Sequence, residues 1–310
     1  MNTPDRRTFM KLILAAGTLP KAVSAIETIA ANEFRKLPST DYRNIFHSKI
    51  DWKPVHDGLE FARVDVYRDR EHVDTVAALR VNPEKNTLRA FNSYEGQNTI
   101  VRTIEEWQRL TGATAMVNSA QYMADPAYMP CALVITDGRQ KGPKINKTVR
   151  GMLVAEPSTD NVPRMDLLDF NYDTFDHKNT PYTQGVQHWP ILLDREGKIK
   201  VQNKLWQANR TVVAKDFDKN ILLFTTEGGF FTLFNFGRFL KESNARPDKG
   251  FKVHTAMNMD GGYEADMVVR SPKLSYTTYG EFETYGPGRD ATVFDWKIRI
   301  PGVIGVFPRT

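Results

Sequence analysis

The segment from Thr255 to Val269, TAMNMDGGYEADMVV, constrains the fold more than any other stretch of this chain. An apolar, strand-like run ends at Asp260, two glycines follow, and a second apolar run begins at Met267. Adjacent glycines permit positive φ angles and close approach by another group. An acid where a strand opens into a loop is a common position for binding or catalysis. The pattern predicts two strands joined by a tight loop around a candidate acid, and an ordinary Asp-Gly turn between core strands is the alternative.

The N-terminus resembles a twin-arginine export signal. Paired arginines at residues 6–7 precede an aromatic residue, an apolar residue and Lys11, and a modestly apolar run covers residues 12–19. This run is far shorter than the roughly 20 residues that span a bilayer, so we expect no stable membrane anchor. Small residues at 23–25 offer a cleavage site. We therefore expect a signal over residues 1–25, read by the twin-arginine export machinery, and a periplasmic or secreted protein. A basic N-terminus on a cytoplasmic protein is the alternative.

Charge and cysteine content exclude several classes of function. The chain has 310 residues and a formal charge of +5. Residues 1–25 contain four basic residues and one acidic residue, so a charge of about +2 would remain without them. This balance, with no stripe of lysine or arginine, argues against nucleic-acid binding. Cys131 is the only cysteine, so an internal disulfide and a cysteine-based zinc site are both excluded.

Strand and helix patterns are interleaved along the chain, with no internal repeat. Residues 26–57 have few periodic apolar positions and are expected to form an N-terminal arm. For residues 58–310 we expect a single α+β domain of strand-rich mixed sheets with a few packed helices. Thr103 and Glu106 form a capping box for a short helix, and Gly112 ends it. A second helix is expected at residues 232–243 and a polar surface insertion at 158–183. Strands are expected at 59–67, 75–81, 87–92, 113–118, 132–136, 191–193, 198–201, 210–215, 221–226, 291–296 and 302–307.

Four segments occur in an order that resembles the phosphodiester glycosidase family. They are AMVNSAQY at residues 115–122 with ALVITDG at 132–138, GVQHWPILL at 185–193, RTVVA at 210–214 with TEGG at 226–229, and NMDGG at 258–262. The family's usual elements are a strand ending NGGFF or NGGYF, a GLVI-DG strand, a GGP-LL segment, an RTAIG strand and LDGGGS. The resemblance covers roughly residues 60–308. The family is related to the enzyme that uncovers mannose 6-phosphate by removing α-N-acetylglucosamine.

Several glycines of the family's motifs are replaced in this chain. The paired glycines after the asparagine are Ser119 and Ala120, and the GGP segment becomes residues 187–190 (QHWP), in which only the proline is kept. The glycine and serines after DGG become residues 263–265 (YEA). Glycines beside a sugar or phosphate make room and present backbone N–H groups. The larger side chains here would narrow or reshape the pocket.

The resemblance implies cleavage of a sugar–phosphate link at the anomeric carbon. That reaction passes through an oxocarbenium-like state, so it needs a carboxylate and groups that hold the phosphate. Asp260 matches the acid of the family's DGG motif and is the expected catalytic carboxylate. Glu264 or Glu227 is expected to assist as a second acid with a different pKa. The alternatives are a solvated loop acid for Glu264 and an acid that stabilises a helix start for Glu227.

Further residues are expected to bind the substrate. Arg210 offers a bidentate guanidinium to a phosphate, and Asn118 offers an amide to a sugar hydroxyl or to the catalytic acid. His188 could exchange a proton near neutral pH. The remaining expected contacts are Gln187, Gly261, Gly262 and Tyr263. The alternative for Arg210 is a surface ion pair, and the alternative for Asn118 is a turn at the end of a strand. For His188 and Tyr263 the alternative is packing among aromatic side chains.

Two questions remain open at the level of sequence. Asp260, Glu264 and Asp266 carry oxygen ligands that suit calcium or magnesium, but their spacing matches no EF-hand loop, and we expect no metal and no cofactor. The predicted function is an exported hydrolase acting on a sugar-phosphodiester or glycan of the cell envelope. The main alternative is a non-catalytic glycan- or peptidoglycan-binding protein of the same fold. Cleavage of an ordinary glycosidic bond is a third possibility.

Overall fold

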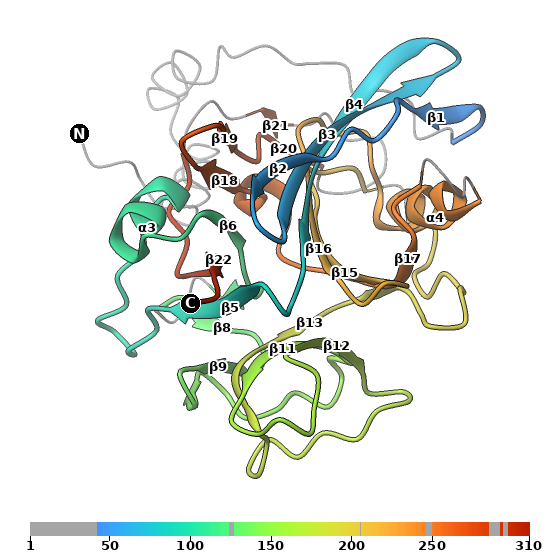
Figure 1. Ribbon diagram of the computed structural model, residues 1–310. Coiled ribbons are helices and arrows are strands. Elements are labelled where there is room, and N and C mark those ends of the chain that lie inside the picture. Colours follow the sequence, from blue (N-terminus) through green and yellow to red (C-terminus); the bar gives the residue numbers. More distant parts are fainter. Residues whose placement is uncertain (1–41, 124–126, 205, 246–249, 285–291, 294–296) are drawn as a thin grey trace, which may run out of the picture.

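The computed structural model describes residues 42–123, 127–204, 206–245, 250–284, 292–293 and 297–310 (Figure 1). The expected export signal and the first part of the expected arm lie outside these residues. The rest of that arm contains β1 (Ile45–His47) and β2 (Lys53–His56). Both strands pair with β3 (Leu59–Arg68), so this part of the segment belongs to a sheet.

The largest sheet carries the segments of interest. Its strand order is β1-β3-β4-β16-β15-β17-β14, with β2 beside β3. The strands not yet given are β4 (Glu71–Val81), β14 (Ile191–Leu193), β15 (Thr211–Asp216), β16 (Ile221–Thr226) and β17 (Val253–Asn258). The β15–β16 hairpin expected from sequence is confirmed. β16 reads ILLFTT and is buried along its whole length, which indicates that both faces of the sheet are covered.

Two smaller sheets complete the strand framework. One has the order β10-β9-β13-β11-β12 and the other β19-β18-β6-β22-β5. Their strands are β5 (Asn86–Asn92), β6 (Ala115–Asn118), β9 (Val134–Thr136), β10 (Arg139–Lys141), β11 (Gly151–Pro157), β12 (Met165–Asp169), β13 (Tyr182–His188), β18 (Met267–Arg270), β19 (Ser275–Thr278) and β22 (Gly302–Pro308). The short pairs β7–β8 (Tyr122–Met123, Met129–Pro130) and β20–β21 (Phe282–Glu283, Thr292–Val293) lie outside them. β12 falls inside the polar stretch at 158–183 that was expected to be a surface insertion, and it pairs with β11.

One hydrophobic core joins the three sheets. It includes Leu79 and Leu223 of the largest sheet, Leu153 of the second and Ile304 of the third. In Figure 1 the sheet of β9, β11, β12 and β13 lies below the other two. Every pairing between the named strands is antiparallel.

Two α-helices of the described residues pack against the sheets, one on the largest sheet and one on the third. α4 (Leu233–Asn244) begins at its N-cap Thr232 and packs a cluster of phenylalanines, including Phe236, against the largest sheet. α3 (Ile104–Thr111) has the expected capping box, ends at Gly112 in the left-handed conformation and packs against the third sheet. These elements confirm the expected strand-rich α+β domain with few helices. Among the described residues, no helix has the length and apolar character to cross a membrane.

Candidate functional site

The loops that carry the predicted site lie at one edge of the largest sheet. β15 begins directly after Arg210, β16 ends directly before Glu227, and β17 ends two residues before Asp260. Since β15 is antiparallel to both of its neighbours, its start lies beside the ends of β16 and β17. The topology therefore gathers, at one edge, polar residues that are far apart in the chain.

The loop after β17 depends on closely packed glycines. Gly262 has a φ of +70°, which favours glycine, and its N–H donates to the carbonyl of Asn209 at 2.8 Å. A Cβ on Gly261 would lie 2.9 Å from that carbonyl oxygen. A Cβ on Gly280 would lie only 2.0 Å from the carbonyl oxygen of Gly262. The backbone on either side therefore holds the loop in place, and larger residues would displace it.

Asn118 fixes the backbone on which Asp260 stands. This buried side chain donates from Nδ2 to the carbonyl oxygen of Asp260 at 2.8 Å. Its Oδ1 accepts from the hydroxyl of Thr211 at 2.7 Å and from the N–H of Asp266 at 3.3 Å. The amide is thus engaged by the protein, and its geometry is that of a positioning group. Asp260 is partly buried, and its carboxylate accepts from the N–H of Gly261 at 3.2 Å.

Arg210 lies beside this loop. Its Nε donates to the carbonyl of Phe231 at 3.1 Å and its Nη2 to the carbonyl of Trp206 at 2.6 Å. Its Nη1 lies 3.9 Å from the position that a Cβ on Gly261 would take. Burial lowers the pKa of Arg210 to about 10, and the charge of Glu283 opposes that shift. In the described part of the chain no carboxylate forms an ion pair with this guanidinium, which suits it to an anionic ligand.

A cleft of about 450 Å³ opens next to Arg210. Two tryptophans, Trp189 and Trp206, and Pro190 give it flat apolar walls, and Glu283 and two lysines give it charged groups. Trp206 is half exposed, and the Nζ of Lys204 lies 5.6 Å from the centre of its ring. Flat aromatic surfaces with polar neighbours are suited to sugar rings. Sequence reasoning missed Glu283 and Trp206, because neither belongs to a recognisable motif.

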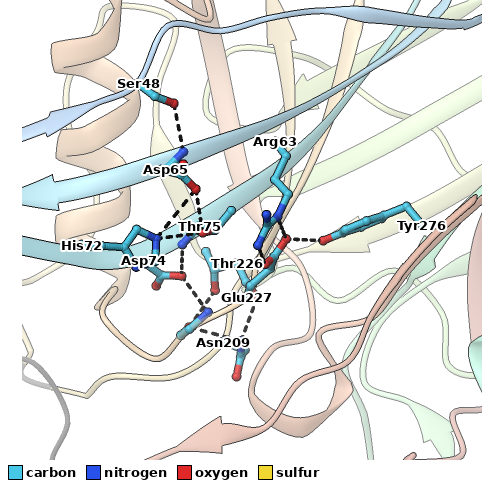
Figure 2. Close-up of polar contacts among 11 residues, drawn as sticks. Ser48, Arg63, Asp65, His72, Asp74, Thr75, Asn209, Thr226, Glu227 and Tyr276 are labelled. Atoms are coloured by element: carbon cyan, nitrogen blue, oxygen red, sulfur yellow. Dashed lines mark hydrogen bonds and ion pairs between the residues drawn. The ribbon is translucent and has the colours of Figure 1, made fainter. Parts of the chain in front are cut away.

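Glu227 is held away from this cleft. Arg63 donates to both of its carboxylate oxygens, at 2.7 and 2.6 Å, and the hydroxyl of Tyr276 donates to it at 2.7 Å (Figure 2). β15 separates β16 from β17, so the strand ends that carry Glu227 and Asp260 are two strand spacings apart, roughly 10 Å. The structure therefore places Glu227 in an ion pair at the same sheet edge and not on the wall of the cleft.

The other predicted acid, Glu264, is buried. Only 1% of it is exposed, and its Oε1 accepts from the hydroxyl of Tyr122 at 3.2 Å. It is therefore not the solvated loop acid that was the alternative at the level of sequence. Among the described residues no group of three or more His, Cys, Asp or Glu side chains could hold a metal ion.

Three residues expected to bind substrate lie in the core. Gln187 accepts from the N–H groups of Leu133 and Asn146, at 3.0 and 2.9 Å, and Tyr263 is 2% exposed. His188 is fully buried, and burial lowers its pKa to about 3. An imidazole with that pKa stays neutral near pH 7, so the expected proton exchange does not fit its environment. The structure does not bring these three side chains to the cleft.

Asn209 connects the loops of the site and was not predicted. Its Nδ2 donates to the carbonyls of Thr226 and Gly228, at 2.7 and 3.2 Å. Its Oδ1 accepts from the N–H groups of Glu281 and Phe282, at 2.9 and 2.8 Å. The only signal in the sequence was its position directly before Arg210.

A partly buried acid lies at the same sheet edge as a buried arginine, and that arginine lines a cleft with tryptophan walls. These features describe a glycan-binding or glycan-cleaving class of protein. A scan against protein-family models narrows this class, because the model for phosphodiester glycosidases matches residues 111–307, more than half of the chain. The chain belongs to the phosphodiester glycosidase family, so the predicted resemblance is confirmed. A search of the curated proteins finds no match.

Three solved structures share the fold. The catalytic domain of zebrafish N-acetylglucosamine-1-phosphodiester alpha-N-acetylglucosaminidase, auto-inhibited by its pro-peptide, has a TM-score of 0.55 at 15% identity, over 86% of this chain and 89% of that one. A hypothetical protein from Synechocystis has a TM-score of 0.56 at 13% identity, over 84% of this chain and 64% of its own length. A protein from Burkholderia pseudomallei has a TM-score of 0.51 at 8% identity, over 90% and 99%.

Proposed function

We propose that this chain is an exported hydrolase that cleaves a sugar-phosphodiester, or a related glycan, of the cell envelope. Family membership supports a glycosidase-type activity, and the phosphodiester in the name of the zebrafish enzyme supports that substrate class. The observation that carries the proposal is the environment of Arg210. Its Nη1 faces Gly261, the residue next to Asp260, and has no carboxylate partner among the described residues. The guanidinium thus lies beside the backbone that carries the proposed acid.

Arg210 and Asp260 have different roles in the proposed reaction. Nη1 of Arg210 binds a non-bridging oxygen of the phosphate. The carboxylate of Asp260 stabilises positive charge at the anomeric carbon or takes a proton from the attacking water. The water oxygen forms a bond to that carbon, the bond from carbon to the phosphate oxygen breaks, and its electron pair leaves with the phosphate monoester.

A phosphate leaving group explains how a single, partly buried carboxylate can suffice for the cleavage. A phosphate monoester is a weak base, with a second pKa of about 6, so it departs near neutral pH without a proton from a general acid. The positions of Glu227, in an ion pair, and Glu264, in the interior, are compatible with this reaction. The cleft beside Arg210 would then hold the alcohol half of the diester, with Trp206 as a stacking surface.

The cellular location is part of the proposal. The paired arginines at residues 6–7 and the short apolar run after them support export in the folded state, which would give the enzyme access to envelope glycans.

A substrate screen with one catalytic variant tests the proposal. The purified chain is incubated with sugar-1-phosphodiesters and cell-wall fragments, and the released phosphate monoester or sugar is measured. We expect Asp260→Asn to lower the rate about 100-fold or more, and Asp218→Asn, an exposed carboxylate on another loop, to leave it unchanged. Wild-type activity in Asp260→Asn would remove the assignment. Binding of these compounds without turnover would favour the glycan-binding alternative.

A further inference from the structure

Asp74 is a buried carboxylate with no basic partner. It lies in β4 and is 2% exposed. Its Oδ1 accepts from the N–H of Thr75 (Figure 2) and from the N–H of Gly228, both at 2.7 Å. Its Oδ2 accepts from the N–H of Phe230 at 3.1 Å. In the described part of the chain it forms no ion pair. A buried charge without a cation is costly, so what this carboxylate holds in place is informative.

The loop that Asp74 holds also contacts the proposed anion site. This loop, residues 228–231, connects β16 to α4. Asn209 donates to the carbonyl of Gly228 at 3.2 Å, and Nε of Arg210 donates to the carbonyl of Phe231 at 3.1 Å. Asn209 in turn accepts from the N–H of Gly262. A short chain of hydrogen bonds therefore links Asp74 to the guanidinium and to the loop of the proposed catalytic acid.

The fit between Asp74 and the loop is tight. A Cβ on Gly228 would lie 2.9 Å from Oδ1 of Asp74, closer than real Cβ atoms approach a neighbour. The glycine lets the loop backbone reach the carboxylate. The carboxylate and the loop are thus matched in shape as well as in hydrogen bonding.

We infer that Asp74 is a positioning residue, which fixes the 228–231 loop so that the Phe231 carbonyl orients Arg210 toward Gly261. The inference rests on the proposed function only in treating Arg210 as the anion-binding group. A carboxylate that accepts three backbone hydrogen bonds can hold two N–H groups of this loop at once. An amide replaces one accepting oxygen by a donor, which would face an N–H of the loop. Protonation turns one oxygen into a hydroxyl, a weaker acceptor whose own proton needs a partner, so either change would release part of the loop.

The environment of Asp74 makes this arrangement sensitive to pH. Burial raises the pKa of Asp74 to about 7, the backbone hydrogen bonds oppose the rise, and the charge of Glu227 adds to it. The charged and titratable groups of the surrounding network are Arg63 and Asp65 of β3, His72 of β4, Glu227 after β16 and Tyr276 of β19. Protonation of Asp74 would thus loosen the loop as the pH falls through about 7.

Nuclear magnetic resonance of the Arg210 Nε–H tests the inference without any turnover. The full chain is labelled with ¹⁵N-arginine, and the signal is assigned with Arg210→Lys. In the wild type we expect the signal to shift with a midpoint near pH 7, and in Asp74→Asn we expect it to stay at the low-pH position. Asp65→Asn is the matched control, since that carboxylate bonds to the hydroxyl of Thr75 and does not contact the loop. The same Arg210 signal in the wild type and in Asp74→Asn at pH 8 would overturn the inference, and so would a wild-type midpoint that persists in Asp74→Asn.

A second variant and a binding assay cover the remaining outcomes. If Asp74→Asn does not fold, Gly228→Ala replaces it, because its added methyl group presses on Asp74 and should also move the Arg210 signal. With glucose 1-phosphate as the probe, we expect about tenfold weaker binding in Asp74→Asn and no change in Asp65→Asn. If the wild type neither binds this probe nor hydrolyses any diester, the proposed function fails, and the Arg210 signal still decides whether Asp74 positions the guanidinium.

Discussion

Replacing His188 by phenylalanine tests how much a buried, neutral imidazole determines the response of this fold to acid. The side chain is fully buried, and neither ring nitrogen has a hydrogen-bond partner in the described structure. Burial lowers its pKa from 6.5 to about 3. Phenylalanine has a similar ring and no titrating group, so the variant keeps the apolar packing and removes the proton-binding site.

The sign and size of the effect follow from the two pKa values. In the unfolded chain the imidazole binds a proton below pH 6.5, whereas in the folded protein it does so only near pH 3. The stability that goes with the neutral form is therefore present above pH 6.5 and is lost as the pH falls toward 3. One pKa unit corresponds to about 1.4 kcal/mol, so the full loss is about 5 kcal/mol, and about 3 kcal/mol of it falls between pH 7.5 and 4.5.

Urea denaturation at pH 7.5 and at pH 4.5 measures this difference. The loss of unfolding free energy between the two pH values should be about 3 kcal/mol larger in the wild type than in His188→Phe. Other titrating groups are common to both proteins, so their contributions cancel in the comparison. At pH 7.5 the variant should be at least as stable as the wild type, because two buried nitrogens without partners are removed. Parallel pH dependence in the two proteins, or a measured His188 pKa near 6.5, would refute the reasoning.

Three further substitutions give distinct outcomes. In the wild type, a folded pKa of Asp74 raised to about 7 adds about 3 kcal/mol of stability as the pH falls from 7.5 to 4.5, and Asp74→Asn should remove this gain. Urea denaturation at both pH values measures the gain. The same change of unfolding free energy with pH in both proteins would contradict the prediction. Glu227→Gln should cost about 1 kcal/mol or less, since its partner Arg63 is half exposed, and should leave turnover within about threefold; a 100-fold loss of rate would restore Glu227 as a catalytic acid. Gly280→Ala should cost about 1–3 kcal/mol and abolish turnover by displacing the Gly262 carbonyl. Gly197→Ala has open space around it but a φ of +73°, so it should cost about 1 kcal/mol and leave turnover intact. Thermal denaturation and the rate are measured together, and equal loss of turnover in both variants would contradict the prediction.

The elements that sequence predicts best are those decided by neighbours along the chain. Thr103, Glu106 and Gly112 set both ends of α3 through local hydrogen bonds, and the turn at residues 216–220 sets the β15–β16 hairpin. The pairing of β4 with β16, in contrast, joins Val76 to Thr226, and no local pattern specifies it. The strand β12 had a local signal in the alternation of MDLLD, but the polar residues around it hid that signal.

The same distinction applies to the site. Arg210 and Asp260 come together because each adjoins a buried strand, and the strands on which they depend were predicted. Whether a residue faces the core or the cleft depends on sheet packing, which sequence does not reveal. His188 and Gln187 are neighbours on β13, so they face opposite sides, and both sides are covered. Glu283 and Trp206 reach the cleft from segments without a motif, so only the assembled fold identifies them.

His188 and Asp74, two of the buried ionisable groups, act in opposite directions on stability. As the pH falls from 7.5 to 4.5, the neutral imidazole costs the fold about 3 kcal/mol, and the protonation of Asp74 returns a similar amount. The net contribution of this pair to global stability is therefore close to zero over that range. Its local effect is not balanced in the same way, because only Asp74 holds the loop that orients Arg210. It follows that anion binding should weaken in mild acid without a matching loss of stability from this pair, so binding and unfolding should be measured separately against pH.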